Sequence, residues 1–221
     1  MSDLFDWTWV TDNLDLIARQ LLQHVYLTVL AVSLGLAISL PVSIFVHRHR
    51  RWYGPATWVA GILYSIPSLA LFALLLPLTG LGVDTAEIGL VSYTLLILIR
   101  NIVTGLDGVP EDANEAARGM GFTDRQLLWK VEVPLALPVI VAGIRLATVT
   151  TIGLVTVTSL IGQGGLGFLM LAGFRNLYPE VAVLVGMVLS VALAVTAEVL
   201  LLGGQRLLVP WGRSVRLGLA T

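Results

Sequence analysis

The sequence contains no cysteine, few charged residues and none of the common catalytic signatures. Without cysteine there is no disulfide framework, no cysteine-based metal site and no thiol catalysis. Charged residues make up 12% of the 221 residues, about half the fraction found in soluble domains. The Walker lysine loop, HExxH and GxSxG motifs are all absent, so no catalytic set is predicted. The net charge of -1 excludes a globally basic nucleic-acid binder.

Long hydrophobic runs take the place of the missing charge. Hydrophobic residues make up 57% of the chain, and the mean hydropathy is +0.89. A helix needs about 20 apolar residues to cross a bilayer. The runs predict an all-α membrane protein with five transmembrane helices, at residues 21–46, 56–78, 88–106, 135–161 and 181–202. Residues 1–20, which include Trp7 and Trp9, are expected at the boundary between the membrane and the water outside the cell or in the periplasm. Residues 203–221 are expected to form a cytoplasmic tail.

The distribution of cations sets the expected orientation, because cytoplasmic loops carry an excess of lysine and arginine. With the N-terminus outside, the segments assigned to the cytoplasm carry nine of the 13 cations. These nine are Arg48, Arg50, Arg51, Arg118, Arg125, Lys130, Arg206, Arg213 and Arg216. The opposite orientation would place all nine outside. The sequence therefore predicts a multi-pass protein of the cytoplasmic (inner) membrane with a cytoplasmic C-terminus.

A polar segment, residues 107–134, separates the third and fourth predicted spans. Pro110 followed by Glu111 is typical of a helix start, and Gly119 and Gly121 are expected to end this helix. A stripe of small or apolar residues is expected on its exposed face, formed by Ala113, Ala116, Ala117 and Met120.

A second short helix is predicted directly after those glycines. Residues 123–126, Thr-Asp-Arg-Gln, have the spacing of a capping box. Leu127, Leu128 and Val131 would form its apolar face, and Pro134 is expected to stop it. Two short helices joined at a glycine on a membrane face predict a rigid projection that another protein can bind.

The same segment resembles the EAA loop of bacterial ABC import permeases. The shared pattern begins with Glu115-Ala116-Ala117 and continues, after three residues, with Gly121. After nine more residues it ends with Val131-Glu132-Val133-Pro134, where valines replace the family's Ile and Leu. An amphipathic connector or a DNA-reading helix-turn-helix fits a segment between two membrane spans less well.

The resemblance implies a type I importer permease with a methionine-permease-like fold. The implied partners are two cytoplasmic ABC ATPase subunits, a second permease copy or paralogue, an extracytoplasmic solute-binding protein and the lipid membrane. The residues implied to contact the ATPase are Glu115, Ala116, Ala117, Gly119, Gly121, Phe122, Val131 and Pro134. ATP and magnesium would bind the partner, so this chain is expected to be no enzyme and to hold no cofactor or metal ion. Glu198 is the only carboxylate within a predicted span, which argues against a gradient-driven carrier.

Two further segments are similar to osmoprotectant permeases: YSIPSLALF in the second predicted span and LIGQGGLG at the outer end of the fourth. The proline of the first predicts a kink that serves either packing or the lining of a transport path. The glycines of the second predict either a helix terminus with a tight turn or an outer gate. The candidate pathway or gate residues are Ser65, Pro67, Ser68, Gly162, Gly164, Gly165 and Gly167.

Charged and aromatic residues near the predicted spans leave further alternatives. Arg145 and Glu198 either pair between the fourth and fifth spans or extend to the membrane surface. Four tryptophans form either an interfacial belt, which is favoured, or a cage for a quaternary ammonium. They are Trp52, Trp58, Trp129 and Trp211.

The sequence thus predicts the permease subunit of an ATP-driven importer for a compatible solute such as glycine betaine, choline or carnitine. An amino acid such as methionine is the alternative solute, because permeases for it share five spans and an EAA loop. A channel or scaffold outside the ABC class is the third hypothesis.

Overall fold

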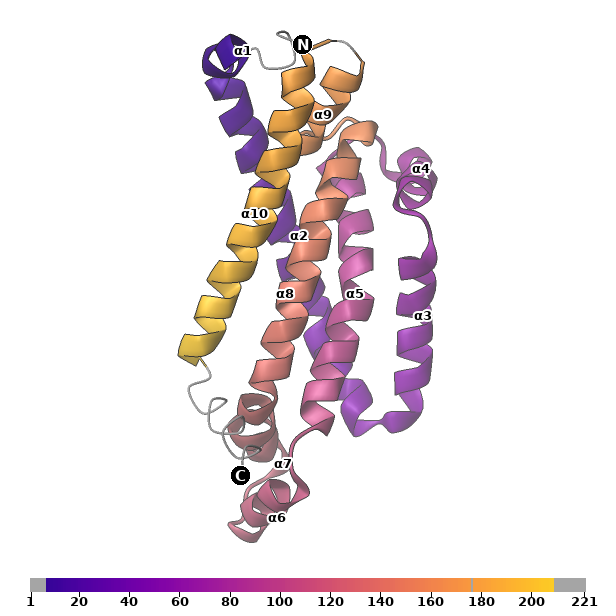
Figure 1. Cartoon of the computed structure of the whole chain (residues 1–221). Helices are drawn as coiled ribbons and strands as arrows, with labels where there is room; N and C mark the ends of the chain where they lie inside the picture. The colour runs from indigo at the N-terminus through magenta and orange to yellow at the C-terminus, as the bar shows by residue number, and fades with distance from the viewer. Residues whose placement is uncertain (1–6, 176, 209–221) are drawn as a thin grey trace.

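The computed structural model describes residues 7–175 and 177–208, and every regular element of these residues is helical. Within them, four helices are long and apolar enough to cross a membrane, and one bent helix pair raises the number of candidate spans to five. The long helices stand side by side in a bundle (Figure 1). Their bounds are Leu14–Arg48 for α2, Val83–Asp107 for α5, Val133–Thr158 for α8 and Glu180–Leu208 for α10. The predicted all-α membrane fold is confirmed.

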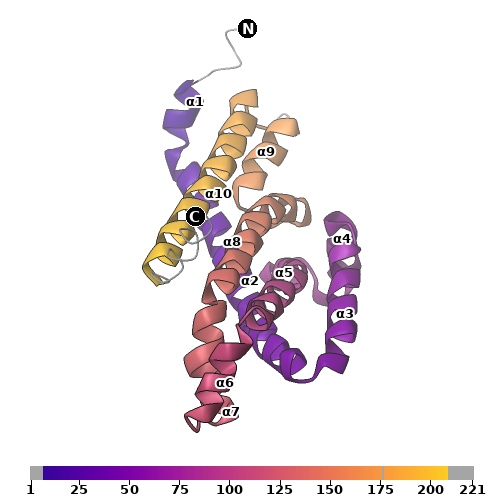
Figure 2. The same ribbon diagram turned by 60° about the horizontal axis from the view of Figure 1, so that its bottom comes forward.

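The second predicted span, residues 56–78, is two helices rather than one. Helix α3 (Tyr53–Ser65) and helix α4 (Ser68–Thr79) are bent by 95° relative to each other. Ile66 is extended, with φ -69° and ψ 128°, because the ring of Pro67 disfavours the helical conformation in the residue before it. In Figure 1, α3 runs along α5 whereas α4 is seen end-on. Both lie on the side of the bundle away from α10 (Figure 2).

Two other predicted boundaries, the start of the third helix and the start of the fourth, differ from those in the structure. The loop expected at residues 79–87 is shorter, because α5 begins at Val83. Asp84 and Glu87 therefore belong to a spanning helix, and the prediction that Glu198 is the only carboxylate in one is incorrect. The helix that contains the fourth predicted span begins earlier than that span, because the chain is helical without interruption from Asp124 to Ile161.

Helix α5 is the centre of the bundle and packs against α2, α3, α4 and α8. Small residues allow these close approaches, as expected where apolar lipid gives helices little hydrophobic drive to associate. An added Cβ at Gly35 would lie 1.9 Å from Oγ1 of Thr94, and one at Gly143 would lie 2.4 Å from Cβ of Asn101. The backbones of α2 and α8 can therefore approach α5 only because these positions lack a side chain.

Short elements close the two ends of the bundle. At the end that carries the chain's first helix lie α1 (Trp7–Asp12), a 3-10 turn (Ser159–Ile161) and α9 (Leu166–Phe174). At the opposite end lie a 3-10 turn (Arg50–Trp52), α6 (Glu111–Gly119), α7 (Asp124–Leu127) and a π-helix (Leu128–Glu132). Residues 1–6 and 209–221 lie outside the described residues, and with them Trp211, Arg213 and Arg216.

Candidate functional site

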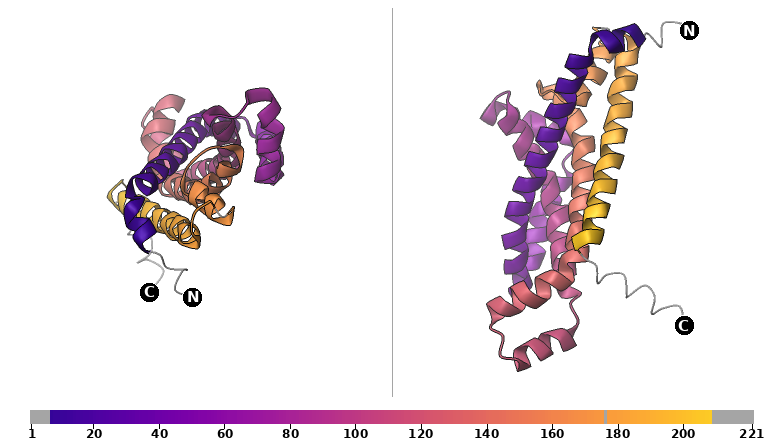
Figure 3. Two further views of the ribbon diagram at one scale, coloured as in Figure 1. Left: turned by 90° about the horizontal axis from the view of Figure 1, so that it is seen from above. Right: turned by 90° about the vertical axis from the view of Figure 1, so that its left-hand side faces the viewer.

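Helices α6 and α7 form a hairpin that projects beyond the end of the bundle (Figure 3, right). Glu111 and Asp112 occupy the first turn of α6, where the helix dipole favours negative charge. The helix ends at Gly119, and Gly121 then adopts φ 82°, a left-handed conformation that glycine adopts without strain. The Phe122 amide returns to the Ala117 carbonyl at 3.1 Å and fixes the turn.

The predicted capping box at the start of α7 is confirmed. The Gln126 amide donates to the hydroxyl oxygen of Thr123 at 3.4 Å, and the Thr123 amide donates to Oε1 of Gln126 at 2.9 Å. These reciprocal bonds satisfy two backbone donors that the helix itself leaves free. The hairpin therefore enters α7 with a fixed geometry.

The expectation that Pro134 stops this helix is wrong. A π-helical turn, Leu128–Glu132, connects α7 to α8, and the Val133 amide donates to the Leu128 carbonyl five residues earlier. Proline lacks the amide that a continuing helix would use, and a wider π turn makes room for its ring. Because the helix continues, the hairpin is joined directly to the long α8, and a force on the hairpin acts on a spanning helix.

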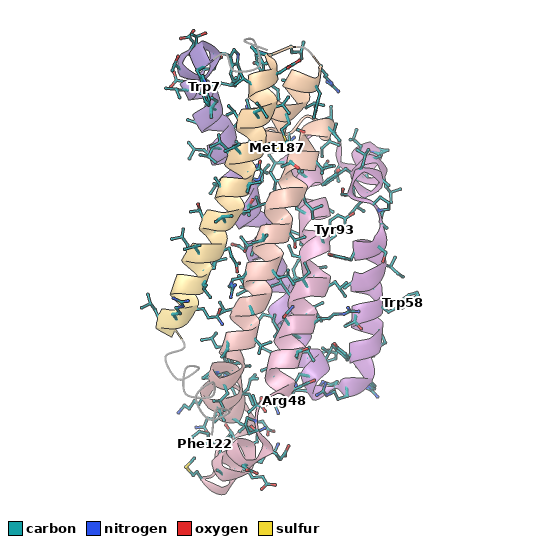
Figure 4. The ribbon with its side chains drawn as sticks, in the orientation of Figure 1. Trp7, Arg48, Trp58, Tyr93, Phe122 and Met187 are labelled. Atoms are coloured by element: carbon teal, nitrogen blue, oxygen red, sulfur yellow. The ribbon has the colours of Figure 1, made fainter. Side chains whose placement is uncertain are left out.

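Arg48, the last residue of α2, attaches the hairpin to the bundle. Its guanidinium donates to the Asp124 carbonyl at 3.3 Å and to Oε2 of Glu132 at 3.2 Å. The Glu132 side chain is only 4% exposed, so it depends on this cation for its charge partner. Figure 4 places Arg48 and Phe122 at the same end of the molecule. Sequence reasoning missed this contact, although the basic cluster at residues 47–51 and the acidic residues of the loop were both visible.

A second contact in the same region involves the end of α5. Nδ1 of His47 lies 2.7 Å from Oδ1 of Asp107, and Nη2 of Arg50 lies 2.5 Å from the same carboxylate. The end of α2 and the 3-10 turn that follows it are thereby joined to the end of α5. The base of the hairpin is thus held from two sides.

The residues expected to contact an ATPase do not share one surface. Ala116 is exposed, whereas the adjacent Ala117 is 1% exposed. The predicted exposed stripe is wrong at Ala117, because that residue is buried where α6 packs against other parts of the chain. The exposed members of the set are Glu115, Ala116, Gly119 and Gly121, and the half-buried members are Phe122, Val131 and Pro134.

The candidate pathway residues fall into two separate places. Ser65, Pro67 and Ser68 form the bend between α3 and α4, where the Ser65 hydroxyl donates to the Gly61 carbonyl at 2.8 Å. The Tyr93 hydroxyl, from α5, donates to the carbonyl of Ile66 and attaches the bend to the bundle. Figure 4 shows Tyr93 on the side of α5 that faces α3.

The glycine turn between α8 and α9 packs against α2 instead. Gly162 and Gly165 have φ of 80° and 87°, so the turn needs glycine at both positions. A Cβ added at Gly164 would lie 2.0 Å from Oε1 of Gln23. A Cβ added at Gly167 would lie 2.0 Å from the carbonyl oxygen of Thr156. The turn is therefore tightly packed on both sides.

Two polar residues of α2 that the sequence did not single out hold this turn. Gln20 accepts a hydrogen bond from the Gly165 amide at 2.8 Å. His24, which is fully buried, accepts from the Leu166 amide at Nδ1 (3.2 Å) and donates from Nε2 to the Ile152 carbonyl (3.0 Å). A histidine placed among apolar residues in a spanning helix was the available signal. These bonds join α2, α8 and α9 at one point.

Arg145 and Glu198 form an ion pair between α8 and α10. The Arg145 side chain is 22% exposed and that of Glu198 is 38% exposed. Arg145 also donates to Oε1 of Gln205 at 3.1 Å, and Nε2 of Gln205 donates to the Pro138 carbonyl at 3.1 Å. The side chains thus bridge two spanning helices that otherwise meet through apolar residues.

We expect Glu198→Gln to lower the melting temperature of the purified permease, because it leaves Arg145 without its charge partner in an apolar setting. The double variant Arg145→Gln/Glu198→Gln should melt closer to wild type. The matched control is Arg100→Gln, which neutralises an exposed cation of α5. Equal melting and equal transport in the single neutralisations and the charge-swapped variant would contradict a role for this pair.

The tryptophans do not form a cage in the described residues. Trp52, Trp58 and Trp129 are 47%, 70% and 49% exposed and lie on three different elements. Trp58 is directed away from the bundle on α3 (Figure 4). This arrangement agrees with an interfacial belt.

The described residues form a polytopic helical membrane protein with a hairpin that projects beyond one end of the bundle. Residues 27–211 match the family model described as binding-protein-dependent transport system inner membrane component, and the chain belongs to this family. The family description places its members in the inner membrane, as parts of transport systems that depend on a binding protein.

Curated relatives cover almost the whole chain. The chain is 39% identical to the osmoprotectant import permease protein OsmW of Salmonella typhimurium, over 92% of this chain and 97% of that protein. It is 35% identical to the glycine betaine/carnitine/choline transport system permease protein OpuCB of Bacillus subtilis, over 86% of this chain and 87% of that protein.

Solved structures show the same fold. The inward-facing MetNI methionine ABC transporter contains a chain that superposes with a TM-score of 0.81 at 24% identity, over 89% of this chain and 98% of that chain. An amino acid ABC transporter solved with histidines gives a TM-score of 0.72 at 19% identity, over 91% of this chain and 98% of that chain. At these identities the likeness concerns the fold alone.

Proposed function

We propose that the chain is the permease subunit of an ATP-driven importer and forms the translocation pathway for a compatible solute such as glycine betaine, choline or carnitine. The observation that carries this proposal is the 39% identity to an osmoprotectant permease over 92% of the chain. The likeness to the methionine transporter is confined to the fold, so it gives methionine no comparable support. Membership of a transport family also leaves little support for a free-standing channel or a scaffold.

The projecting hairpin is the proposed contact for a cytoplasmic ATPase, with Glu115, Ala116, Gly119 and Gly121 on its exposed surface. The ion pair of Arg48 and Glu132 and the continuous helix into α8 support this role, because a rigid hairpin transmits displacement. Two ATPase subunits that bind ATP and magnesium, a second permease copy or paralogue and an outer solute-binding protein complete the proposed importer. In this assembly the N-terminal end of the bundle faces outward and the hairpin faces the cytoplasm.

Closure of the ATPase pair on ATP would move the hairpins together and change the accessibility of the pathway. The bend at Ser65, Pro67 and Ser68 and the glycine turn at residues 162–167 are the proposed moving or lining parts. Ala117 and Val131 would contribute indirectly, because they shape the hairpin from its less exposed side.

The proposal is tested by reconstituting the tagged permease in liposomes with a candidate ATPase and a candidate binding protein from the same organism. We expect ATP-dependent uptake of radiolabelled glycine betaine, choline or carnitine and no comparable uptake of methionine. Uptake of methionine alone would overturn the solute assignment. Failure of any ATPase to co-purify with the wild-type chain would overturn the coupling role of the hairpin.

A further inference from the structure

Glu87 lies in a cavity between α2, α4 and α5, at the end of the bundle away from the hairpin. The cavity is lined by Leu34, Ile38, Thr79, Asp84, Glu87, Ile88, Val91, Ser92 and Leu95. Leu34, Ile38, Asp84 and Ile88 are exposed, whereas Glu87 is only 6% exposed. Glu87 therefore occupies the inner part of a cavity whose outer residues are accessible.

The carboxylate of Glu87 has no partner in the described part of the chain. Neither of its oxygens accepts a hydrogen bond, and both are buried. The hydroxyls nearby are engaged elsewhere, since Thr79 donates to the Leu75 carbonyl at 3.0 Å and Ser92 to the Ile88 carbonyl at 2.7 Å. Thr85, two residues before Glu87, donates to the Gly80 carbonyl at 2.5 Å. The surroundings thus leave a negative group without any donor.

An unpaired carboxylate in such a place is unfavourable by several kcal/mol unless a cation or a proton neutralises it. Carboxylates in spanning helices therefore usually mark binding or transport positions. Nothing in the lining of this cavity supplies the missing charge, because its only other ionisable residue is Asp84, which is also acidic. The neutralising cation or proton must therefore come from outside the chain.

We propose that this cavity binds the quaternary ammonium group of the transported solute, with Glu87 as its counter-charge. A quaternary ammonium carries its charge on methyl groups and donates no conventional hydrogen bond, so apolar walls with a nearby negative charge suit it. The cavity offers the negative charge of Glu87 and apolar walls. Five of its lining residues are apolar: Leu34, Ile38, Ile88, Val91 and Leu95. A primary ammonium would instead need hydrogen-bond acceptors distributed around it.

The position of the cavity agrees with a site on the route of the solute, and here the inference rests on the proposed function. Glu87 is 20 residues before Asp107, the end of α5 at the base of the hairpin. At 1.5 Å per residue the two are about 30 Å apart along the helix, roughly the thickness of the hydrocarbon core. In the proposed orientation, Glu87 lies near the outer face, where a binding protein would release the solute. Asp84, one turn earlier and exposed, adds a second negative charge at the entrance.

The test measures equilibrium binding of radiolabelled choline to the purified permease–ATPase complex without the binding protein. We expect the wild-type complex to bind radiolabelled choline. Unlabelled choline should displace the bound label, whereas 3,3-dimethyl-1-butanol, the uncharged isostere of choline, should not. Glu87→Gln should weaken choline binding by about tenfold or more, the effect of removing one close charge partner. Glu180→Gln is the matched control, because it makes the same change at an exposed position on the same end of the bundle. A second variant, Leu34→Trp, should reduce binding by filling the cavity while Glu87 stays intact.

The outcomes separate this site from the function on which it rests. If the wild-type importer takes up glycine betaine and Glu87→Gln binds choline as wild type does, the site is wrong and the function stands. Displacement by the isostere as strong as that by choline would overturn the charge-based site in the same way. If the wild-type importer takes up no quaternary ammonium, the proposed function falls and this assignment falls with it.

Discussion

Gly167→Ala is expected to destabilise the permease, although alanine is ordinarily the better helix former. Gly167 is the second residue of α9, and an added Cβ would lie 2.0 Å from the carbonyl oxygen of Thr156 in α8 and 2.7 Å from its Cα. Both are backbone atoms, so no side chain can move aside and the two helices must separate. Overpacking of this kind costs about 1–3 kcal/mol. We therefore expect a melting temperature lower by about 2–12 °C, together with reduced uptake.

Gly153→Ala is the matched control for this variant. Gly153 lies in α8, one turn before Thr156, and no atom lies within 4 Å of a Cβ added there. By helix propensity alone, alanine at this position stabilises by about 1 kcal/mol. If Gly153→Ala and Gly167→Ala have the same melting temperature, the close approach of α8 and α9 does not constrain the permease. The glycine at position 167 would then have to be explained by motion rather than by packing.

Local sequence signals predicted the parts of the fold that depend on local physics. The hydrophobic runs identified the bundle because helix length and apolarity are properties of a single segment. The capping box was predicted from Thr123 and Gln126 because both of its hydrogen bonds lie within four residues. The kink at Pro67 was predicted for the same reason, but its angle of 95° was not. That angle also depends on Tyr93, which reaches the bend from α5.

The parts that sequence reasoning missed depend on contacts between distant segments. Nothing in the local sequence of α6 shows that Ala117 is buried and Ala116 exposed, because the distinction depends on how α6 packs against segments outside it. The ion pair of Arg48 and Glu132 joins residues 84 positions apart. The start of α5 at Val83 was missed because Asp84 and Glu87 lower the local hydropathy of the span. In the structure both residues belong to α5 and line one cavity.

Substituting Ala116 by arginine is expected to abolish ATP-driven uptake while leaving the permease folded. Ala116 is exposed on α6, and arginine is a good helix former, so the hairpin itself should tolerate the change. In the proposed assembly the ATPase approaches Ala116 closely, so a long cationic side chain there would prevent docking. We expect the affinity for the ATPase to fall by about tenfold or more. Co-purification of the ATPase with the tagged permease measures the loss, and the melting temperature of the free permease measures the fold.

The neighbouring Ala117 provides the contrast that makes this prediction specific. It is 1% exposed, so Ala117→Arg must either bury a cation or displace α6 from the π-helix. That variant should lose both ATPase binding and permease stability, whereas Ala116→Arg should lose ATPase binding alone. Ala116→Ser, which adds a single atom, should retain both. If Ala116→Arg still co-purifies with the ATPase, the exposed side of α6 is not the docking surface. The contact would then lie on the other exposed part of the hairpin, around α7.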